Sequence, residues 1–187
     1  MLRDFTIREL ERNIGKEIYV SEWTSVSQSE INEFARVTRD PDPNHVDPEF
    51  ARTNGPFGTP VLFGFQLLAL LSSLCRPLRF QHGTGKVGYE LNYGLNRVRF
   101  VTPVPVNAHF RNHVILKRVE QRKNGDYLIT TLNTIELEGA PRPALVAEWI
   151  GLLSQGAALT PPRPVPDSSP TTGPPRSRKP APEAEGD

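Results

Sequence analysis

Three carboxylates and one imidazole lie within one short stretch of the sequence, between Thr38 and Asp47. Asp40, Asp42 and Asp47 supply carboxylates, and His45 supplies an imidazole. Two prolines within the stretch stiffen the chain. Proton transfer to and from water at neutral pH requires two acid/base groups of different pKa held close together. The stretch is therefore a candidate for general acid/base chemistry.

The same side chains could instead form a structural turn or a metal site. A histidine in a loop rich in aspartate and proline commonly forms a turn or caps a helix, and carboxylates with a histidine can bind a metal ion. The spacing of the three aspartates and His45 matches neither an EF-hand nor a zinc pattern, and Pro43 limits their convergence. We expect no metal site here. The residues alone leave catalysis and a structural turn both open.

Composition narrows the class of protein. The chain has 187 residues, which suits one domain with its own core. Its formal net charge is +1, from 22 basic and 21 acidic side chains, without the basic stripe of a nucleic-acid binder. Cys75 is the single cysteine, which excludes an intrachain disulfide, and its leucine neighbours predict a buried thiol rather than a nucleophile.

Neither end of the sequence indicates export or membrane insertion. The first ten residues carry four charged side chains, unlike a secretory signal. The longest apolar stretch, Val61 to Leu74, falls short of the about 20 residues that span a bilayer. From Thr160 onward proline, serine, threonine, glycine and charge replace nearly every large apolar residue. We expect a cytoplasmic protein with a folded domain over 1–159 and a disordered tail over 160–187.

The elements around the acid/base stretch are short. Spacing of apolar residues predicts a helix ending before Gly15, and a first strand over 17–23. Ser27 precedes Glu30 by three residues, a capping-box pattern, and predicts a helix that ends near Asp40 because prolines follow. Asp47 is placed to cap another short helix over 48–53.

Beyond these pieces the pattern changes twice. The run over 61–74 is apolar nearly all round, which predicts one long helix enclosed by other elements. Alternating residues then predict strands over 89–101, 114–119, 127–137 and 144–153, with Asn124 and Gly125 as a hairpin turn. We expect an α+β fold in which a curved antiparallel sheet wraps the central helix.

Two blocks of sequence resemble one family. The run TRDPDPNHVDPEFARTNGPFGTPVLFGFQLLALLSSL resembles the hydratase motif of the MaoC-like, R-specific enoyl-CoA hydratases, and LNYGLNRVRFVTPVPVNAHF resembles the strand block of its NodN-like branch. Asp40 and His45 fall on the two catalytic positions of the first motif. The likeness covers about Ile14 to Leu153 and implies a hot-dog fold.

The resemblance implies a hydro-lyase, an (R)-specific 2-enoyl-CoA hydratase or 3-hydroxyacyl-thioester dehydratase. Asp40 and His45 would activate the water that adds to C3 of a trans-2-enoyl thioester and return a proton to C2. The reaction places negative charge on the carbonyl oxygen, and Gly64 occupies the family position whose backbone amide stabilises such an oxyanion. No cofactor is implied, because coenzyme A enters as part of the substrate.

Further residues are candidates for substrate binding, although their own chemistry supports that role less. Ser72 matches a family hydroxyl on the central helix, although a hydroxyl bonded to its own helix is an equal alternative. Arg97 could meet coenzyme A phosphates or a carrier protein, with a solvated strand face as the alternative. Asn44, Phe63 and Phe65 complete the expected substrate-binding set.

The sequence also departs from the family pattern. Arg39 stands where glycine is usual, Asp42 where asparagine is usual and Phe63 where histidine is usual. We expect Asp42, as a third carboxylate, to raise the pKa of either itself or Asp40 or to repel a bound anion, and we expect Phe63 to narrow the acyl pocket. These departures favour a shift of substrate over loss of catalysis.

The resemblance also implies a homodimer with sheets joined edge to edge. Two other functions are alternatives to an enoyl-CoA hydratase. One is a 3-hydroxyacyl carrier-protein dehydratase of fatty acid synthesis, and the other is a non-catalytic acyl-thioester-binding or scaffold protein. We expect no nucleic-acid and no membrane partner.

Overall fold

A computed structural model describes residues 3–81 and 89–154 of the chain. The expected disordered tail from Thr160, the boundary near residue 159, and His82 with the glycine-rich turn after it lie outside the described residues.

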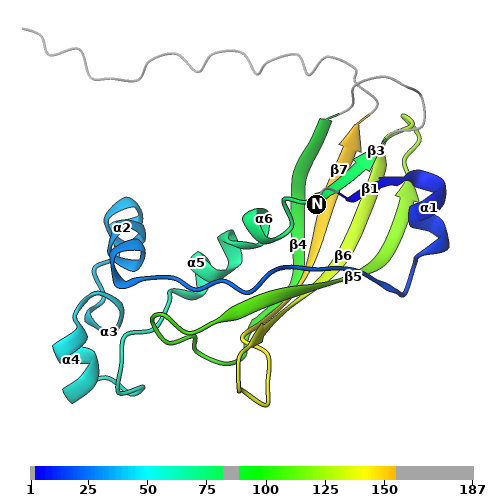
Figure 1. The fold of residues 1–187 in the computed structure, drawn as a ribbon. Helices are drawn as coiled ribbons and strands as arrows, with labels where there is room; N and C mark the ends of the chain where they lie inside the picture. The colour runs from blue at the N-terminus through cyan, green and yellow to red at the C-terminus, as the bar shows by residue number, and fades with distance from the viewer. Residues whose placement is uncertain (1–2, 82–88, 155–187) are drawn as a thin grey trace, which may run out of the picture. The chain divides into compact units, whose positions relative to one another are not determined.

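Five antiparallel strands form the main sheet (Figure 1). Their order across the sheet is β2-β5-β6-β7-β4, and their bounds are Glu17–Val20 for β2, Phe110–Gln121 for β5, Tyr127–Leu137 for β6, Leu145–Ser154 for β7 and Tyr89–Phe100 for β4. The Asn124-Gly125 turn joins β5 to β6 as predicted, and Gly125 takes a φ of 89°, which glycine adopts without strain. Strand β2, which was predicted as the first strand, ends three residues earlier than predicted.

The central helix is split in two. Helix α5 covers Gly64–Ala69 and α6 covers Leu71–Leu74, so the prediction of one helix over 61–74 is wrong. Val61 and Leu62 are extended, because the Leu62 amide donates to the Val104 carbonyl at 2.9 Å. At the break, the Leu70 carbonyl accepts hydrogen bonds from both the Ser73 hydroxyl and the Leu74 amide, each at 2.9 Å.

The two helices pack against the buried face of the sheet. Leu67, Leu71 and Leu74 share one core with Phe110, Ile135, Leu145 and Ala147 from three strands. The arrangement of a sheet curved around a central helical segment is therefore confirmed. The enclosure is partial, because Phe65 on α5 is 73% exposed.

The amino terminus differs from the prediction. Residues Arg3–Thr6 form strand β1, which pairs in parallel with β3 over Leu78–Gln81, and only Ile7–Arg12 form helix α1. Phe5 therefore lies in a strand opposite Phe80, not in a helix. Strand β3 was not predicted, because four residues next to Pro77 carry no clear alternation.

Three short helices precede the central segment. Helix α2, Gln28–Thr38, begins with the predicted capping box, in which the Glu30 amide donates to the Ser27 hydroxyl. Helix α3 covers Pro43–Val46, and α4, Pro48–Thr53, is capped by Asp47 as predicted. Figure 1 shows the three helices side by side, next to α5.

Candidate active site

Asp40 is placed by the way α2 ends. Arg39 adopts a left-handed conformation with a φ of 59°, and the Asp40 amide donates to the Ala35 carbonyl at 3.1 Å. This is the Schellman arrangement that glycine usually completes. The left-handed turn explains why glycine suits position 39, and it leaves the Asp40 side chain exposed to solvent.

Asp42 has a structural task of its own. Its carboxylate accepts a hydrogen bond from the Asn44 amide at 2.8 Å and caps α3. The bond from the Asn44 backbone, followed in size by an opposing effect of burial, leaves the pKa of Asp42 below its usual value. The carboxylate is therefore committed to the helix cap, a role that asparagine also fills.

His45 is held by the backbone at a neighbouring segment. Its Nδ1 lies 2.7 Å from the Val61 carbonyl oxygen, and the Gln28 side-chain amide donates to the His45 carbonyl at 2.7 Å. A carbonyl only accepts, so Nδ1 carries the proton. In the neutral ring, Nε2 then has a lone pair available to take a proton.

Phe63 covers one face of this imidazole. The two rings stack with centroids 3.8 Å apart and planes 29° apart, and Phe63 is only 5% exposed. Phe63 is not among the residues that line the cavity beside His45. The expectation that Phe63 narrows an acyl pocket is therefore not met in this cavity, because its side chain packs beneath the histidine.

His45 and Gly64 border one cavity of about 290 Å³. Apolar residues make up most of its wall, including Val61, Leu67 and Phe100. Gly64 is the first residue of α5, where a backbone amide has no partner within the helix. A Cβ at Gly64 would lie 3.1 Å from the Phe100 ring, so a side chain there would crowd the cavity.

The structure does not bring every predicted residue to this cavity. Asp40 is not among its lining residues, and Asn44 directs its side-chain amide to Asp42 at 3.0 Å. Phe65 points outward and contacts Phe100 edge to face. Ser72 donates to the Ala69 carbonyl at 2.9 Å, which supports its structural alternative.

Arg97 lies away from the cavity. It occupies a bulge in β4 with a φ of 50°, which interrupts the strand alternation predicted for Arg97 and Arg99. Its side chain is 84% exposed and lies 3.9 Å from Glu148, a weak surface pair. The solvated alternative describes this geometry better than a phosphate contact does.

Sequence reasoning missed two residues near His45 and Gly64. The Val61 carbonyl accepts the hydrogen bond from His45, and Phe100 faces Gly64. Phe63 was predicted to bind substrate, whereas its ring stacks on His45. Phe100 ends the RVRF block that resembles the family, which is the one signal that pointed to it. Backbone carbonyls and packed aromatic rings leave no recognisable spacing in a sequence.

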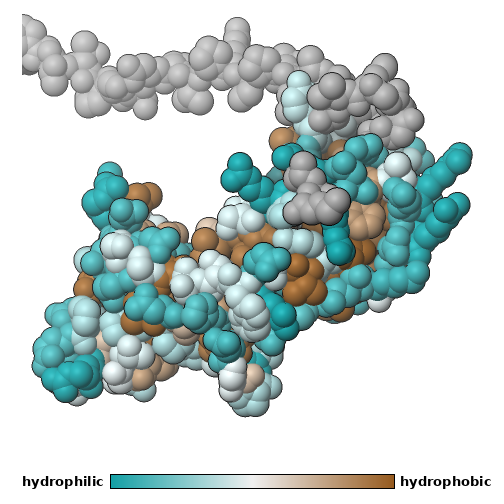
Figure 2. Space-filling model, in the orientation of Figure 1, coloured by the Kyte–Doolittle hydropathy of each residue, from teal (hydrophilic) through white to brown (hydrophobic). Residues whose placement is uncertain are grey.

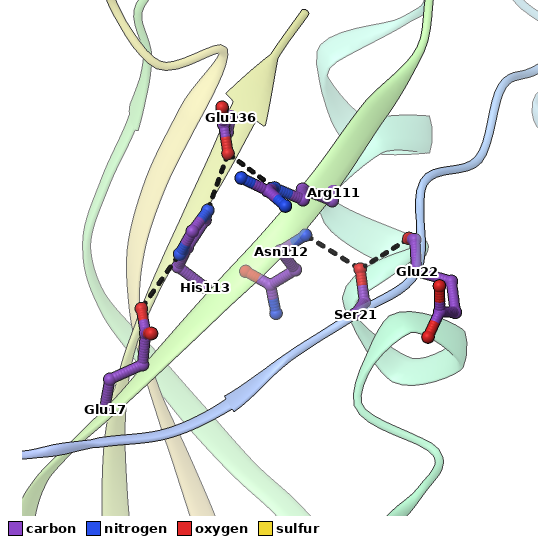
Figure 3. Close-up of polar contacts among 7 residues, drawn as sticks. All are labelled: Glu17, Ser21, Glu22, Arg111, Asn112, His113 and Glu136. Carbon is purple, nitrogen blue, oxygen red and sulfur yellow. Dashed lines mark hydrogen bonds and ion pairs between the residues drawn. The ribbon is translucent and has the colours of Figure 1, made fainter.

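A second histidine sits in a different polar cluster (Figure 3). His113 on β5 binds Glu17 through Nδ1 at 2.8 Å and Glu136 through Nε2 at 2.7 Å, and Arg111 also binds Glu136 at 2.6 Å. Burial alone would lower the pKa of His113, but the two carboxylate bonds outweigh it and raise the pKa. Both ring nitrogens are engaged, as expected for a structural histidine.

Cys75 also fits its structural prediction. Asn112 donates to its sulfur at 3.2 Å, and burial raises the pKa of the thiol to about 12. The thiol therefore stays protonated at neutral pH and is a poor nucleophile.

Over residues 3–81 and 89–154, no group of three or more His, Cys, Asp or Glu side chains is arranged to hold a metal ion. Within the same ranges, no helix is long and apolar enough to cross a membrane.

Comparison with known proteins gives a consistent family. Residues 9–137 match the model of the MaoC like domain. The chain is 41% identical over 145 residues to the 3-hydroxyacyl-thioester dehydratase Z of Mycobacterium tuberculosis (strain CDC 1551 / Oshkosh), covering 78% of this chain and 93% of that protein. It is 36% identical over 156 residues to nodulation protein N of Rhizobium leguminosarum bv. viciae, covering 81% of this chain and 93% of the relative.

Among solved structures, the (R)-hydratase from A. caviae involved in PHA biosynthesis superposes with a TM-score of 0.55. The two chains are 24% identical, and the match covers 72% of this chain and 96% of the other. At that identity the likeness shows the fold, which is the hot-dog fold that the sequence resemblance implied.

Proposed function

Because this chain belongs to the MaoC-like dehydratase family, we propose that it catalyses the reversible hydration of a trans-2-enoyl thioester to a 3-hydroxyacyl thioester. The proposed product has R stereochemistry. One relative is named as a 3-hydroxyacyl-thioester dehydratase and one similar solved structure as an (R)-hydratase, which supports a hydro-lyase. Coenzyme A is the proposed carrier of the acyl group, no separate cofactor is required, and the cytoplasm is the proposed compartment.

One observation carries the proposal. His45 is locked in one tautomer, with Nδ1 bound to the Val61 carbonyl at 2.7 Å, at the edge of a cavity that also contains the first amide of α5. In the hydration direction, Nε2 takes a proton from water as its oxygen bonds to C3. The electrons of the C2–C3 double bond move toward the thioester carbonyl, and C2 then receives a proton. Removal of water follows the same steps in reverse.

Gly64 is proposed to stabilise the charge that develops during this reaction. Its amide is the first of α5, and donors of this type stabilise an oxyanion because they are already oriented. The Phe100 ring lies over Gly64 and is 48% exposed, so it has room to turn when a thioester carbonyl approaches.

Asp40 is proposed as the second acid/base group. It leaves the left-handed end of α2 five residues before His45, and its side chain is exposed. An exposed carboxylate on a turn can swing toward a bound water, whereas the carboxylate of Asp42 is held by its helix cap. Asp40 would orient the water, and the proton that Nε2 of His45 takes from this water would be delivered to C2.

A homodimer is the proposed assembly. Strand β4 is an edge of the sheet, and it exposes Tyr89, Tyr93, Leu95 and Phe100. Phe65 on α5 adds another exposed ring beside Phe100. Figure 2 shows apolar side chains at the surface where the helices meet the sheet. Unpaired edge strands with apolar side chains are prone to pair with another chain, so a second copy would cover this face.

The test uses the purified full chain, first checked for a dimer mass by light scattering. We expect wild type to remove the enoyl absorbance of crotonyl-CoA. We expect Asp40→Asn and His45→Ala each to lower turnover by about 100-fold or more. Asp42→Asn is the matched control, since asparagine preserves the cap, and it should keep turnover within about threefold.

The arms of this assay also separate the alternatives. Turnover of carrier-protein-bound enoyl groups with none of the coenzyme A thioester would favour a carrier-protein dehydratase. Thioester binding without turnover of short, long or carrier-bound substrates would contradict the enzyme and favour an acyl-binding scaffold.

A further inference from the structure

Phe63 connects the two elements that carry the proposed acid/base pair. It is the residue before α5, and its side chain is buried between α2 and α3. On one side its ring stacks on His45 at 3.8 Å, and on the other it meets the Phe34 ring of α2 at 5.3 Å. The Phe34 and Phe63 rings are tilted by 43°, so ring contacts run from α2 to α3 but only the pair of Phe63 and His45 is stacked.

Two independent constraints act on the His45 ring. The hydrogen bond from Nδ1 to the Val61 carbonyl selects the tautomer and decides which edge of the ring faces outward. That single bond still allows the ring to tilt about the line that joins the two atoms. A flat aromatic face at 3.8 Å and 29° restricts this tilt, because tilting would drive the imidazole into the Phe63 ring.

A hydrogen bond that does not involve these rings also joins α2 to α3. Phe34 lies one turn before the end of α2, and the turn that follows α2 carries Asp40. The Gln28 side chain, at the start of α2, holds the His45 carbonyl at 2.7 Å. A change of side chain at Phe63 would therefore alter the surface against which the His45 ring lies, while the Gln28 hydrogen bond still joins the two helices.

We propose that Phe63 is a positioning residue for the reaction, which sets the plane of the His45 imidazole through the 3.8 Å stack and so aims Nε2 at the reacting water. Phe63 acts through His45 and does not touch substrate, since the cavity wall does not include it. The inference rests on the proposed hydratase function. Phe63 contributes to the reaction through its flat ring, not through hydrophobicity alone.

A purely structural role makes a different prediction. If Phe63 served only as core, then any apolar side chain of similar bulk would suffice, and Phe34 would be its equivalent. Leucine fills space but offers no flat face, so Phe63→Leu tests the ring plane. Phe34→Leu is the matched control, because Phe34 contacts Phe63 and packs against the same core, while the ring stacked on His45 is that of Phe63.

The first measurement is steady-state hydration of crotonyl-CoA, with thermal unfolding of each variant run in parallel. We expect Phe63→Leu to lower kcat by about tenfold or more with KM within about twofold, since small misplacements of a catalytic group cost large factors in rate. Phe34→Leu should lower the unfolding temperature similarly yet keep kcat within about threefold. Phe63→His restores a flat ring and should recover most of the lost kcat.

The second measurement does not depend on turnover. Proton NMR of the histidine ring signals, assigned with His45→Ala, should show the His45 ring protons shifted upfield by the stacked ring in wild type. That shift should disappear in Phe63→Leu and persist in Phe34→Leu.

The outcomes separate the two claims. An inactive wild type would overturn the proposed function, and the positioning role with it. An active wild type with kcat unchanged in Phe63→Leu, an equal loss of kcat in Phe34→Leu, or unshifted His45 ring protons in wild type would each overturn the positioning role alone. A variant that fails to fold is replaced by Phe63→Met, for which the same loss of kcat is expected, and retention of kcat contradicts the proposal.

Discussion

Two histidines in this molecule are held in opposite ways. His113, on the sheet, gives both ring nitrogens to carboxylates, Glu17 at 2.8 Å and Glu136 at 2.7 Å (Figure 3). His45, beside the cavity, gives Nδ1 to a backbone carbonyl and one ring face to Phe63. Two carboxylates favour the charged imidazolium, which ties the strands together, whereas a neutral carbonyl selects one tautomer and leaves the other nitrogen available for chemistry.

The surroundings of a histidine, and not its presence, indicate a catalytic role. The cluster at His113 joins β2, β5 and β6 through three charged partners, since Arg111 shares Glu136. No cavity described here includes His113, whereas the cavity of about 290 Å³ includes His45. The first region is built to hold strands together, and the second is built to present one nitrogen.

Replacing His113 should sharpen this contrast through stability. The carboxylate bonds raise the pKa of His113 above its ordinary value of 6.5, so its stabilisation is complete below that value and is lost as pH rises through the raised pKa. We expect His113→Gln to lower the free energy of unfolding by about 1 kcal/mol near pH 6, with a smaller loss at alkaline pH, where the imidazole is neutral. Urea unfolding at the two pH values measures this, and turnover should stay within about twofold.

A pH-independent loss of stability in His113→Gln would contradict the charged cluster. A loss of turnover as large as that of His45→Ala would remove the distinction between the two histidines.

A smaller effect is expected at the turn that precedes the acid/base stretch. Arg39 holds a left-handed φ of 59°, a conformation that costs a non-glycine residue free energy. We expect Arg39→Gly to raise the free energy of unfolding by about 0.5 kcal/mol, because the relief of strain exceeds the entropy added to the unfolded chain. Thermal unfolding tests this, and a lower melting temperature would show that the Arg39 side chain contributes more than its backbone strain costs.

Local signals predicted the elements that local chemistry determines. The capping box of Ser27 and Glu30, the cap at Asp47 and the Asn124-Gly125 turn each involve residues a few positions apart, and each forms as expected. The family motif located His45 and Gly64, which border one cavity.

Contacts between distant segments could not be predicted in this way. The parallel pairing of Phe5 with Phe80 joins residues far apart in the sequence, and an apolar run does not reveal that Leu62 is extended against Val104. The stack of Phe63 on His45 depends on how the start of α5 docks onto α3. Phe63 therefore looked like a pocket residue in the sequence, although its place is beneath the catalytic candidate.

The proposed mechanism requires Asp40 and His45 to act on the same water, although Asp40 does not line the cavity beside His45. A double-mutant cycle in the crotonyl-CoA assay tests it most directly, with Asp40→Asn, His45→Gln and the double variant. The effects of residues that act as a unit are not additive. We therefore predict that turnover by the double variant is no more than about threefold below that of the less active single variant. Losses that multiply would show that the two side chains act separately, and would contradict the account.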